Sequence, residues 1–297
     1  MDIVLCADDN YAMPCGVCLT SLFENNRDTE CNVYILTVGF SEATNALFAQ
    51  LSEKYQQTIQ IVPIDSSLFQ NLKVSDRFRE SIYYRFLIPD IVKGDKALYL
   101  DCDIIVTSSL KELWETDVTD YACAAVEDQR GDDIVQHNRI EMYSTYFNSG
   151  VLLMNLNYWR QHDVKQQLVD YIYANPDRCL YPDQDALNVV LEHKVLLLDY
   201  KYNYQQQMSL PSSELYLHRS KWAQANKYME ELPVIIHYSS NLKPWHVEYP
   251  HFYKSIFFEY KSKSPWASYE IHYRATKRER YYSSIMRYVR KLLSMLD

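Results

Sequence analysis

The stretch KALYLDCDIIV, residues 96–106, places an apolar run directly before two aspartates. The run Ala97–Leu100 predicts a buried strand, and Asp101 and Asp103 follow at its carboxyl end. Residues i and i+2 of an extended chain face the same way, so we expect the two carboxylates to point together off the strand. Ligands bind at the carboxyl ends of strands in open α/β sheets. Because neighbouring carboxylates repel unless a cation lies between them, the stretch predicts a site for a hard divalent cation.

Strands and helices alternate before and after this stretch, which predicts βαβ units around a mostly parallel sheet flanked by helices. Upstream, the apolar patterns predict strands at 2–7, 32–37 and 58–63, and helices at 14–24 and 41–55. Downstream, they predict strands at 121–126, 147–154, 195–198 and 234–236, helices at 163–174 and 183–191, and an acidic loop at 127–133.

Length and composition exclude several classes of protein. The 297 residues are 47% hydrophobic and 23% charged, as in a globular protein with a buried core. The five glycines are too widely spaced for a Gly-rich dinucleotide loop or a P-loop. The longest uncharged run, 142–159, carries six Ser, Thr or Asn residues and is a poor membrane span. The start is no signal peptide and the seven cysteines are an odd number, so we expect a cytosolic protein with reduced thiols.

Charge is distributed unevenly along the chain. Residues 271–292 hold seven Lys or Arg against one acid, a net +6; since the whole chain carries −9, the remainder carries −15. An acidic body disfavours nucleic-acid binding. The basic, aromatic tail predicts amphipathic helices that lie on an anionic membrane surface. Packing of this tail on the acidic body, or an oligomer contact, remains the alternative.

Two further residues carry chemistry close to strand ends. His237 follows the apolar run 234–236, and an imidazole added to two carboxylates favours Mn²⁺ over Mg²⁺ or Ca²⁺. Lys243 stands before a proline in a polar loop, where its ammonium can face a phosphate. A structural histidine and a solvated lysine are the alternative interpretations of these two residues.

Three short motifs are open to two interpretations each. Residues 8–11, DDNY, offer acceptors for a ribose and a ring for stacking, or simply cap a helix. Residues 183–185, DQD, present polar groups to a substrate, or complement a helix dipole. Cys15 and Cys18 form a C-x-x-C pair, which fits a buried helix face better than a redox site in a chain of this size.

Five stretches follow one another in order: ADDNY at 7–11, LYLDCDIIV at 98–106, FNSGVLLMNL at 147–156, YPDQDALN at 181–188 and HYSSNLKPWH at 237–246. Together they resemble glycosyltransferase family 8, and specifically its bacterial lipopolysaccharide α-galactosyl- and α-glucosyltransferases. The likeness spans residues 1 to roughly 252. It implies a Rossmann-like GT-A fold in a catalytic domain at 1–255, followed by a helical, membrane-associating tail at 256–297.

The resemblance also implies the roles of individual residues. The Mn²⁺ ligands would be Asp101, Asp103 and His237, with Mg²⁺ as a possible substitute. The remaining assignments are Ala7, Asp8, Asn10 and Tyr11 for uridine and ribose, Arg85, Asp128, Asn148, Ser149, Asp183 and Gln184 for the donor sugar, and Cys102, Ser240 and Lys243 for the remaining donor contacts, with Lys243 on the diphosphate. The chain departs from the family at Ser240, which is usually Gly, and at Ser149, which is usually Ala; the second change bears on donor-sugar choice.

The implied activity is retaining transfer of galactose or glucose from a UDP-sugar to a saccharide acceptor. The acceptor would be a lipopolysaccharide core or another lipid-linked glycan on the inner face of the cytoplasmic membrane. Gln184 is a weak nucleophile, which favours a same-face ion-pair route over covalent attack by Gln184 or Asp183. The alternatives are a nucleotide-sugar-binding protein without turnover, and a haloacid-dehalogenase-like phosphatase with Asp101 as nucleophile.

Overall fold

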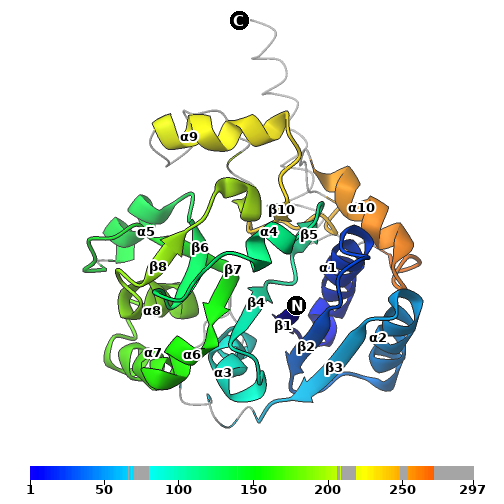
Figure 1. Ribbon diagram of the computed structural model, residues 1–297, viewed down its shortest axis with the longest axis horizontal. Helices are drawn as coiled ribbons and strands as arrows, with labels where there is room; N and C mark the ends of the chain where they lie inside the picture. The colour runs from blue at the N-terminus through cyan, green and yellow to red at the C-terminus, as the bar shows by residue number, and fades with distance from the viewer. Residues whose placement is uncertain are drawn as a thin grey trace, which may run out of the picture.

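A seven-stranded sheet runs through the centre of the protein in the computed structural model (Figure 1). Its order is β3-β2-β1-β4-β7-β6-β8, and β7 is antiparallel to both of its neighbours while the other pairs are parallel. The expected mixed, mostly parallel sheet is therefore confirmed. The bounds are β1 Asp2–Cys6, β2 Asn32–Thr37, β3 Thr58–Pro63, β4 Lys96–Leu100, β6 Cys123–Glu127, β7 Phe147–Asn155 and β8 Val195–Leu197.

The structure describes residues 1–65, 67, 69, 72, 80–138, 140–205, 208, 219–247 and 253–270. The basic part of the expected tail, 271–297, lies outside these residues. Within the described part of the chain, every helix is too short or too polar to cross a membrane.

Alternating apolar side chains bury both faces of the sheet, because successive residues of a strand point to opposite sides. Leu98 and Leu100 of β4 pack on one side, and Tyr99 packs on the other. The first side is covered by α1 Ala12–Asn25, α2 Glu42–Tyr55 and α10 Lys254–Lys263. The second side is covered by the 3₁₀ helix η3 Glu80–Leu87 and by α3 Ile88–Ile91, α6 Leu156–Gln161, α7 Val164–Ala174 and α8 Pro182–Val190.

A second sheet of three short strands carries His237. Strand β10, Ile235–His237, pairs antiparallel with β5, Ile104–Val106, and parallel with β9, Tyr204–Gln205. In this register His237 lies opposite Ile104, the residue after Asp103. The backbone N–H of Tyr238 also donates to the carbonyl of Asp103 at 2.9 Å. Strand pairing thus brings a histidine 134 positions away in sequence to the two aspartates.

The prediction of an acidic loop at 127–133 is wrong. Strand β6 continues to Glu127, and helix α5, Gly131–Asn138, begins after a tight turn in which Gly131 N–H donates to the Asp128 carbonyl at 3.0 Å. The pattern of acids and glycine concealed a helix start. Sequence analysis also missed η3, β9 and short helices such as α4 Lys111–Trp114 and α9 Arg219–Asn226, whose apolar periodicity is weak.

The chain after α10 returns to the core. Helix α10 lies beside α1 (Figure 1), and Trp266 is fully buried beneath it. The Trp266 ring packs edge-on to Phe48 at a centroid distance of 4.9 Å. A Cβ on Gly16 of α1 would come within 2.1 Å of this ring, so the close approach depends on glycine. Residues up to 266 therefore belong to the packed body.

Trp266→Ala should lower the free energy of unfolding by about 3–5 kcal/mol, because it empties a large buried site that neighbouring helices cannot refill. Urea unfolding followed by circular dichroism measures this loss. Tyr269→Ala, at a side chain that is 47% exposed, is the matched control and should change stability by less than about 1 kcal/mol. Equal, small losses for both variants would contradict the packing role of Trp266.

Candidate active site

A polar cleft of about 1190 Å³ opens at the carboxyl ends of β1 and β4, beside the start of β7. It gathers residues from segments that are far apart in the sequence. Five carboxylates and three basic side chains line it. The sequence-predicted residues found there are Ala7, Asp8, Tyr11, Arg85, Asp101, Cys102, Asp103, Asp128, Asn148, Ser149, Asp183, Gln184, His237, Ser240 and Lys243.

Asp101, Asp103 and His237 converge on one point of this cleft. Each offers a ligand atom, and these atoms lie within 4.8 Å of one another. The His237 Nε2 atom is 3.2 Å from Asp103 Oδ1 and 3.7 Å from Asp101 Oδ2. Cys102 and Asp103 form a turn after β4, so the carboxylates meet through this turn and not through an extended strand. Two carboxylates and an imidazole are a donor set that suits a divalent metal such as Mn²⁺.

Gly150 provides the space in which these ligands meet. A Cβ at this position would lie 2.3 Å from His237 Cε1 and 2.8 Å from Asp101 Oδ2. Any side chain on β7 at residue 150 would thus displace the ligands. The residues present therefore fit a divalent cation in both chemistry and shape.

One oxygen of Asp101 is already occupied by the protein. Asp101 Oδ1 accepts from the Tyr99 hydroxyl at 2.6 Å and from Arg85 Nη2 at 3.1 Å. Burial raises the pKa of Tyr99 well above its usual range, so its hydroxyl stays protonated and acts as the donor. This leaves Oδ2 facing His237, and such orientation of a ligand by its neighbours is common at metal sites.

Lys243 forms an ion pair with Asp103 and donates to the Tyr238 carbonyl at 2.7 Å. Burial alone would raise the pKa of Asp103, but the adjacent Lys243 ammonium outweighs it and holds that pKa well below its usual value. Asp103 is therefore ionised at neutral pH. The sequence-predicted lysine thus lies directly beside the metal-site carboxylates.

Arg85 connects the metal end of the cleft to the sugar end. Its guanidinium is buried and stacks over the Tyr99 ring at 4.2 Å. It forms ion pairs with Asp101 at 3.1 Å and with Asp183 at 3.0 Å. Burial raises the pKa of Asp183, and the nearby Arg85 opposes this rise. Arg85 thus supports two acidic residues of the cleft at once.

The Gln184 amide is held at both ends. Its Oε1 accepts from the Ser149 N–H at 2.9 Å and from the Ser149 hydroxyl at 3.3 Å. Its Nε2 donates to Asp128 Oδ2 at 3.1 Å and to the Tyr146 hydroxyl at 3.3 Å. The departure from the family at Ser149 therefore adds a hydroxyl contact to Gln184, and another to Asp183 at 3.2 Å.

The mouth of the cleft carries an aromatic pair. Tyr11, 40% exposed, packs edge-on to Trp245 at a centroid distance of 6.1 Å. Asp8 caps the 3₁₀ helix Asp9–Tyr11, which confirms the capping interpretation, and it also lines the cleft, where a ribose contact stays a prediction. Asn10 is not among the lining residues; it is exposed, and its side chain donates to Asp8 at 3.2 Å.

Sequence reasoning missed several residues that support the site, among them Tyr99, Tyr146, Asn203 and Trp245. Asn203 had a signal, because it is an amide flanked by two tyrosines in YKYNYQ, residues 200–205. The C-x-x-C pair lies within α1, where Cys15 and Cys18 are both fully buried.

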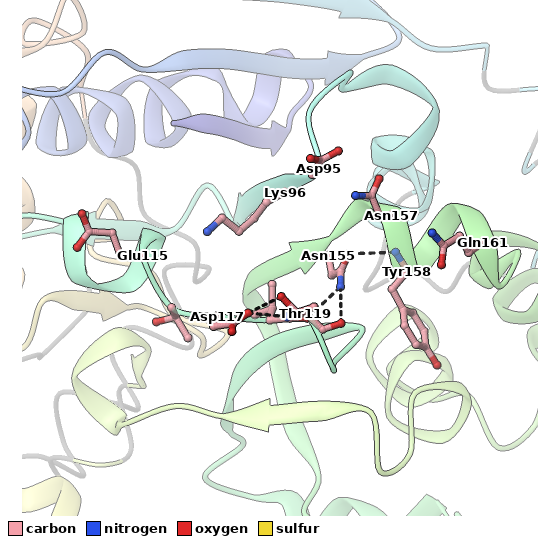
Figure 2. Close-up of a pocket in the computed structure, with 11 residues that line it drawn as sticks. Asp95, Lys96, Glu115, Asp117, Thr119, Asn155, Asn157, Tyr158 and Gln161 are labelled. Carbon is pink, nitrogen blue, oxygen red and sulfur yellow. Dashed lines mark hydrogen bonds between the residues drawn. The ribbon is translucent and has the colours of Figure 1, made fainter.

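A second depression, of about 600 Å³, lies at the opposite ends of β4 and β7 (Figure 2). Its polar groups largely bond to one another. The Asn155 amide donates to the carbonyls of Val118, Thr119 and Tyr121, and Lys96 donates to the Trp114 carbonyl. These contacts tie the connection after α4 to the sheet, which is a structural task.

The mixed sheet and the cleft at its carboxyl edge define a glycosyltransferase of the GT-A type. The structure of the galactosyltransferase LgtC in complex with donor and acceptor sugar analogues superposes with a TM-score of 0.79 at 29% identity, over 89% of this chain and 96% of that one. The chain belongs to glycosyl transferase family 8, whose family model matches residues 2–248. The resemblance inferred from the five stretches is thereby confirmed.

Curated relatives agree with this membership. The lipopolysaccharide 1,2-glucosyltransferase of Escherichia coli is 30% identical over 80% of this chain and 71% of its own length. General stress protein A of Bacillus subtilis is 28% identical over 90% of this chain and 94% of its own length. Membership of a glycosyltransferase family argues against the haloacid-dehalogenase-like phosphatase. The surroundings of Asp101 agree, because Oδ1 accepts from the Tyr99 hydroxyl and Oδ2 faces His237.

Gly150→Ala should weaken Mn²⁺ binding at least about tenfold, because the new methyl group pushes His237 and Asp101 apart. Isothermal titration with Mn²⁺ measures the affinity, and the thermal midpoint reports on folding. Gly94→Ala is the control, since its Cβ would lie close to the movable Asp2 carboxylate, at 2.8 Å, and at ordinary contact distance from the Lys96 backbone, and neither residue lines the cleft. Unchanged Mn²⁺ affinity in a folded Gly150→Ala variant would contradict this placement of the cation.

Proposed function

We propose that the protein is a retaining hexosyltransferase that moves galactose or glucose from a UDP-sugar to a saccharide acceptor. The observation that carries the proposal is the meeting of Asp101, Asp103, His237 and Lys243 in one cleft with the buried Asp183–Gln184 pair. This arrangement would put cationic stabilisation of a diphosphate next to polar groups suited to a sugar, which supports the proposal. The catalytic domain would span 1–255, with α10 and Trp266 packed against its core.

The leaving group explains why the cleft is built this way. Cleavage of the sugar–phosphate bond leaves negative charge on the UDP diphosphate. Mn²⁺, or Mg²⁺ in its place, would supply Lewis-acid stabilisation of that charge when held by Asp101, Asp103 and His237. Lys243 would add a second positive charge from the loop after β10. The cleft is lined by more acidic than basic side chains, so without the cation and Lys243 it would repel an anionic diphosphate.

The hydrogen bonds of Gln184 support an ion-pair route. A nucleophilic amide oxygen needs a free lone pair, whereas Gln184 Oε1 accepts from the Ser149 N–H at 2.9 Å and lies 3.3 Å from the Ser149 hydroxyl, whose single hydrogen it shares with Asp183 Oδ2. We therefore assign Gln184 the positioning of the sugar and stabilisation of its developing positive charge. Asp128 and Asp183 would share the task, because carboxylates near an oxocarbenium-like centre lower its energy.

The mouth of the cleft is suited to the nucleoside. The Asp8 carboxylate would accept from ribose hydroxyls, Tyr11 and Trp245 present aromatic surface for the base, and Cys102, Ser240 and Ala7 complete the donor contacts. Relatives named as a galactosyltransferase and as a glucosyltransferase support both hexoses as candidates. The relatives named for lipopolysaccharide support an acceptor that is lipid-linked.

The direct test is incubation with Mn²⁺ and either UDP-glucose or UDP-galactose, with sugar release followed by mass spectrometry. Wild-type protein should hydrolyse one donor slowly in Mn²⁺ and lose this activity in excess chelator. Lys243→Met should slow hydrolysis roughly 100-fold or more, because it removes one charge from the transition state. Asp103→Ala should abolish Mn²⁺-dependent turnover.

Three outcomes would count against the proposal. Binding of UDP-sugar without turnover would indicate a binding protein. Full activity in chelator would remove the metal from the mechanism. A loss below about threefold in Lys243→Met would make Lys243 a structural partner of Asp103 instead of a catalytic residue.

We further propose that residues 271–297 attach the enzyme to the inner face of the cytoplasmic membrane. Seven basic residues lie among aromatic and aliphatic ones in 271–292. Each basic residue near an anionic surface contributes about 1 kcal/mol, so a few suffice for reversible attachment. Trp266, which precedes this segment by five residues, packs against Gly16 of α1, the helix that begins at the mouth of the cleft, and this supports attachment close to the site.

Truncation after residue 270 should release the protein from vesicles that contain phosphatidylglycerol, while donor hydrolysis stays unchanged. Co-sedimentation at low salt measures attachment. This end point keeps Trp266, so the fold is preserved, and neutral phosphatidylcholine vesicles are the control. Equal binding of the truncated and full-length proteins, or indifference of the full-length protein to anionic vesicles, would make the tail structural.

A further inference from the structure

A row of buried polar side chains joins the metal end of the cleft to the sugar end. His237 Nδ1 is 2.9 Å from Asn203 Oδ1, and Asn203 Nδ2 is 2.9 Å from Asn148 Oδ1. Asn148 Nδ2 donates in turn to Asp128 Oδ2 at 2.9 Å, the same oxygen that accepts from Gln184. Asn203 stands in the middle of this row and is fully buried.

A backbone group fixes the direction of the row. The N–H of Gly150 donates to Asn148 Oδ1 at 3.0 Å, and a backbone N–H can only donate. The acceptor at Asn148 must therefore be its carbonyl oxygen, which leaves its NH₂ group to face the Asp128 carboxylate. Both contacts of Asn148 are then satisfied with one orientation of the amide.

The orientation of the Asn148 amide also determines the orientation of the Asn203 amide. Because Asn148 presents a carbonyl oxygen, the group of Asn203 that meets it is the NH₂ group. The carbonyl oxygen of Asn203 then faces His237 Nδ1 and can only accept. His237 must carry a hydrogen on Nδ1, so the lone pair of neutral imidazole lies on Nε2.

We infer that Asn203 is a positioning residue that presents His237 Nε2 to the cation and, with its other end, orients Asn148 toward Asp128. The inference deepens the proposed function and rests on it. Nε2 faces Asp103 Oδ1 at 3.2 Å and Asp101 Oδ2 at 3.7 Å, so three acceptors meet where a cation would bind. Neighbours that hold a ligating histidine in one tautomer typically contribute 10–100-fold to metal affinity.

Two substitutions separate the two ends of Asn203. Asn203→Leu has a similar volume and removes both contacts, so Mn²⁺ affinity should fall 10–100-fold. Asn203→Asp keeps an acceptor for His237 Nδ1 and loses the donor to Asn148. Its Mn²⁺ affinity should stay within about threefold of wild type, while kcat for UDP-hexose hydrolysis falls about tenfold or more, because Asn148 loses its support.

Asn26→Leu is the matched control. Asn26 is also a buried amide with two backbone partners, Leu22 and Leu110, but it lies at the end of α1 away from the cleft. This variant should lose stability and keep its Mn²⁺ affinity. Isothermal titration gives the affinities, and long-range ¹⁵N–¹H spectra of the histidine rings at mildly alkaline pH give the tautomer of His237.

Each result decides the inference. Wild-type Mn²⁺ affinity in a folded Asn203→Leu variant would overturn it, and so would an Nε2–H form of His237 in the wild-type protein. If Asn203→Leu fails to fold, Asn203→Asp decides: a loss of Mn²⁺ affinity above tenfold overturns the role, and retained affinity with reduced kcat supports it. If wild-type protein itself does not bind Mn²⁺, the proposed metal-dependent function fails, which is a separate result.

Discussion

The hydrogen bond from Asp101 N–H to the Gly150 carbonyl, 2.8 Å long, is the contact on which the site depends. It continues the antiparallel pairing of β4 and β7 by one residue, so that the turn after β4 faces the first residues of β7. Asp101 and Asp103 then meet His237 above Gly150, while Asn148 and Ser149 face Asp128 and Gln184. Because β7 is antiparallel to its neighbours, its amino-terminal end lies at the edge of the sheet where the parallel strands have their carboxyl ends.

Two basic side chains balance the negative charge of the aspartates in the cleft. Arg85 compensates two aspartates, and Lys243 compensates a third. Buried ion pairs of this kind are costly to break on one side, because the remaining charge stays desolvated. The cleft is accordingly preorganised: most of its acids are held by the protein before any substrate arrives, and little reorganisation is left for the reaction itself.

Local pattern predicted the strands of the main sheet, the sheet type and the metal-site candidates Asp101, Asp103 and His237, whereas most other cleft residues were implied by the family resemblance. Asp101 and Asp103 follow an apolar run, and Asp183 and Gln184 follow a proline at a helix start. The partners of Asn203, His237 and Asn148, are brought to it by strand pairing, so its role as a support could not be predicted from local pattern, whereas Tyr99 is an i, i+2 neighbour of Asp101 that sequence reasoning overlooked. The prediction of a loop at 127–133 failed for a related reason. The polarity of Asp128 suggested a solvent-exposed position, but contacts from Asn148 of β7 and Gln184 of α8 bury it.

The placement of Trp266 has a consequence for how such chains can diversify. This ring fills the space that a side chain on Gly16 would need, so a larger residue at position 16 requires a smaller one at position 266, and the two positions can change only together. The central strands of the sheet are coupled in the same way, because β4 and β7 supply supports to one another across the cleft.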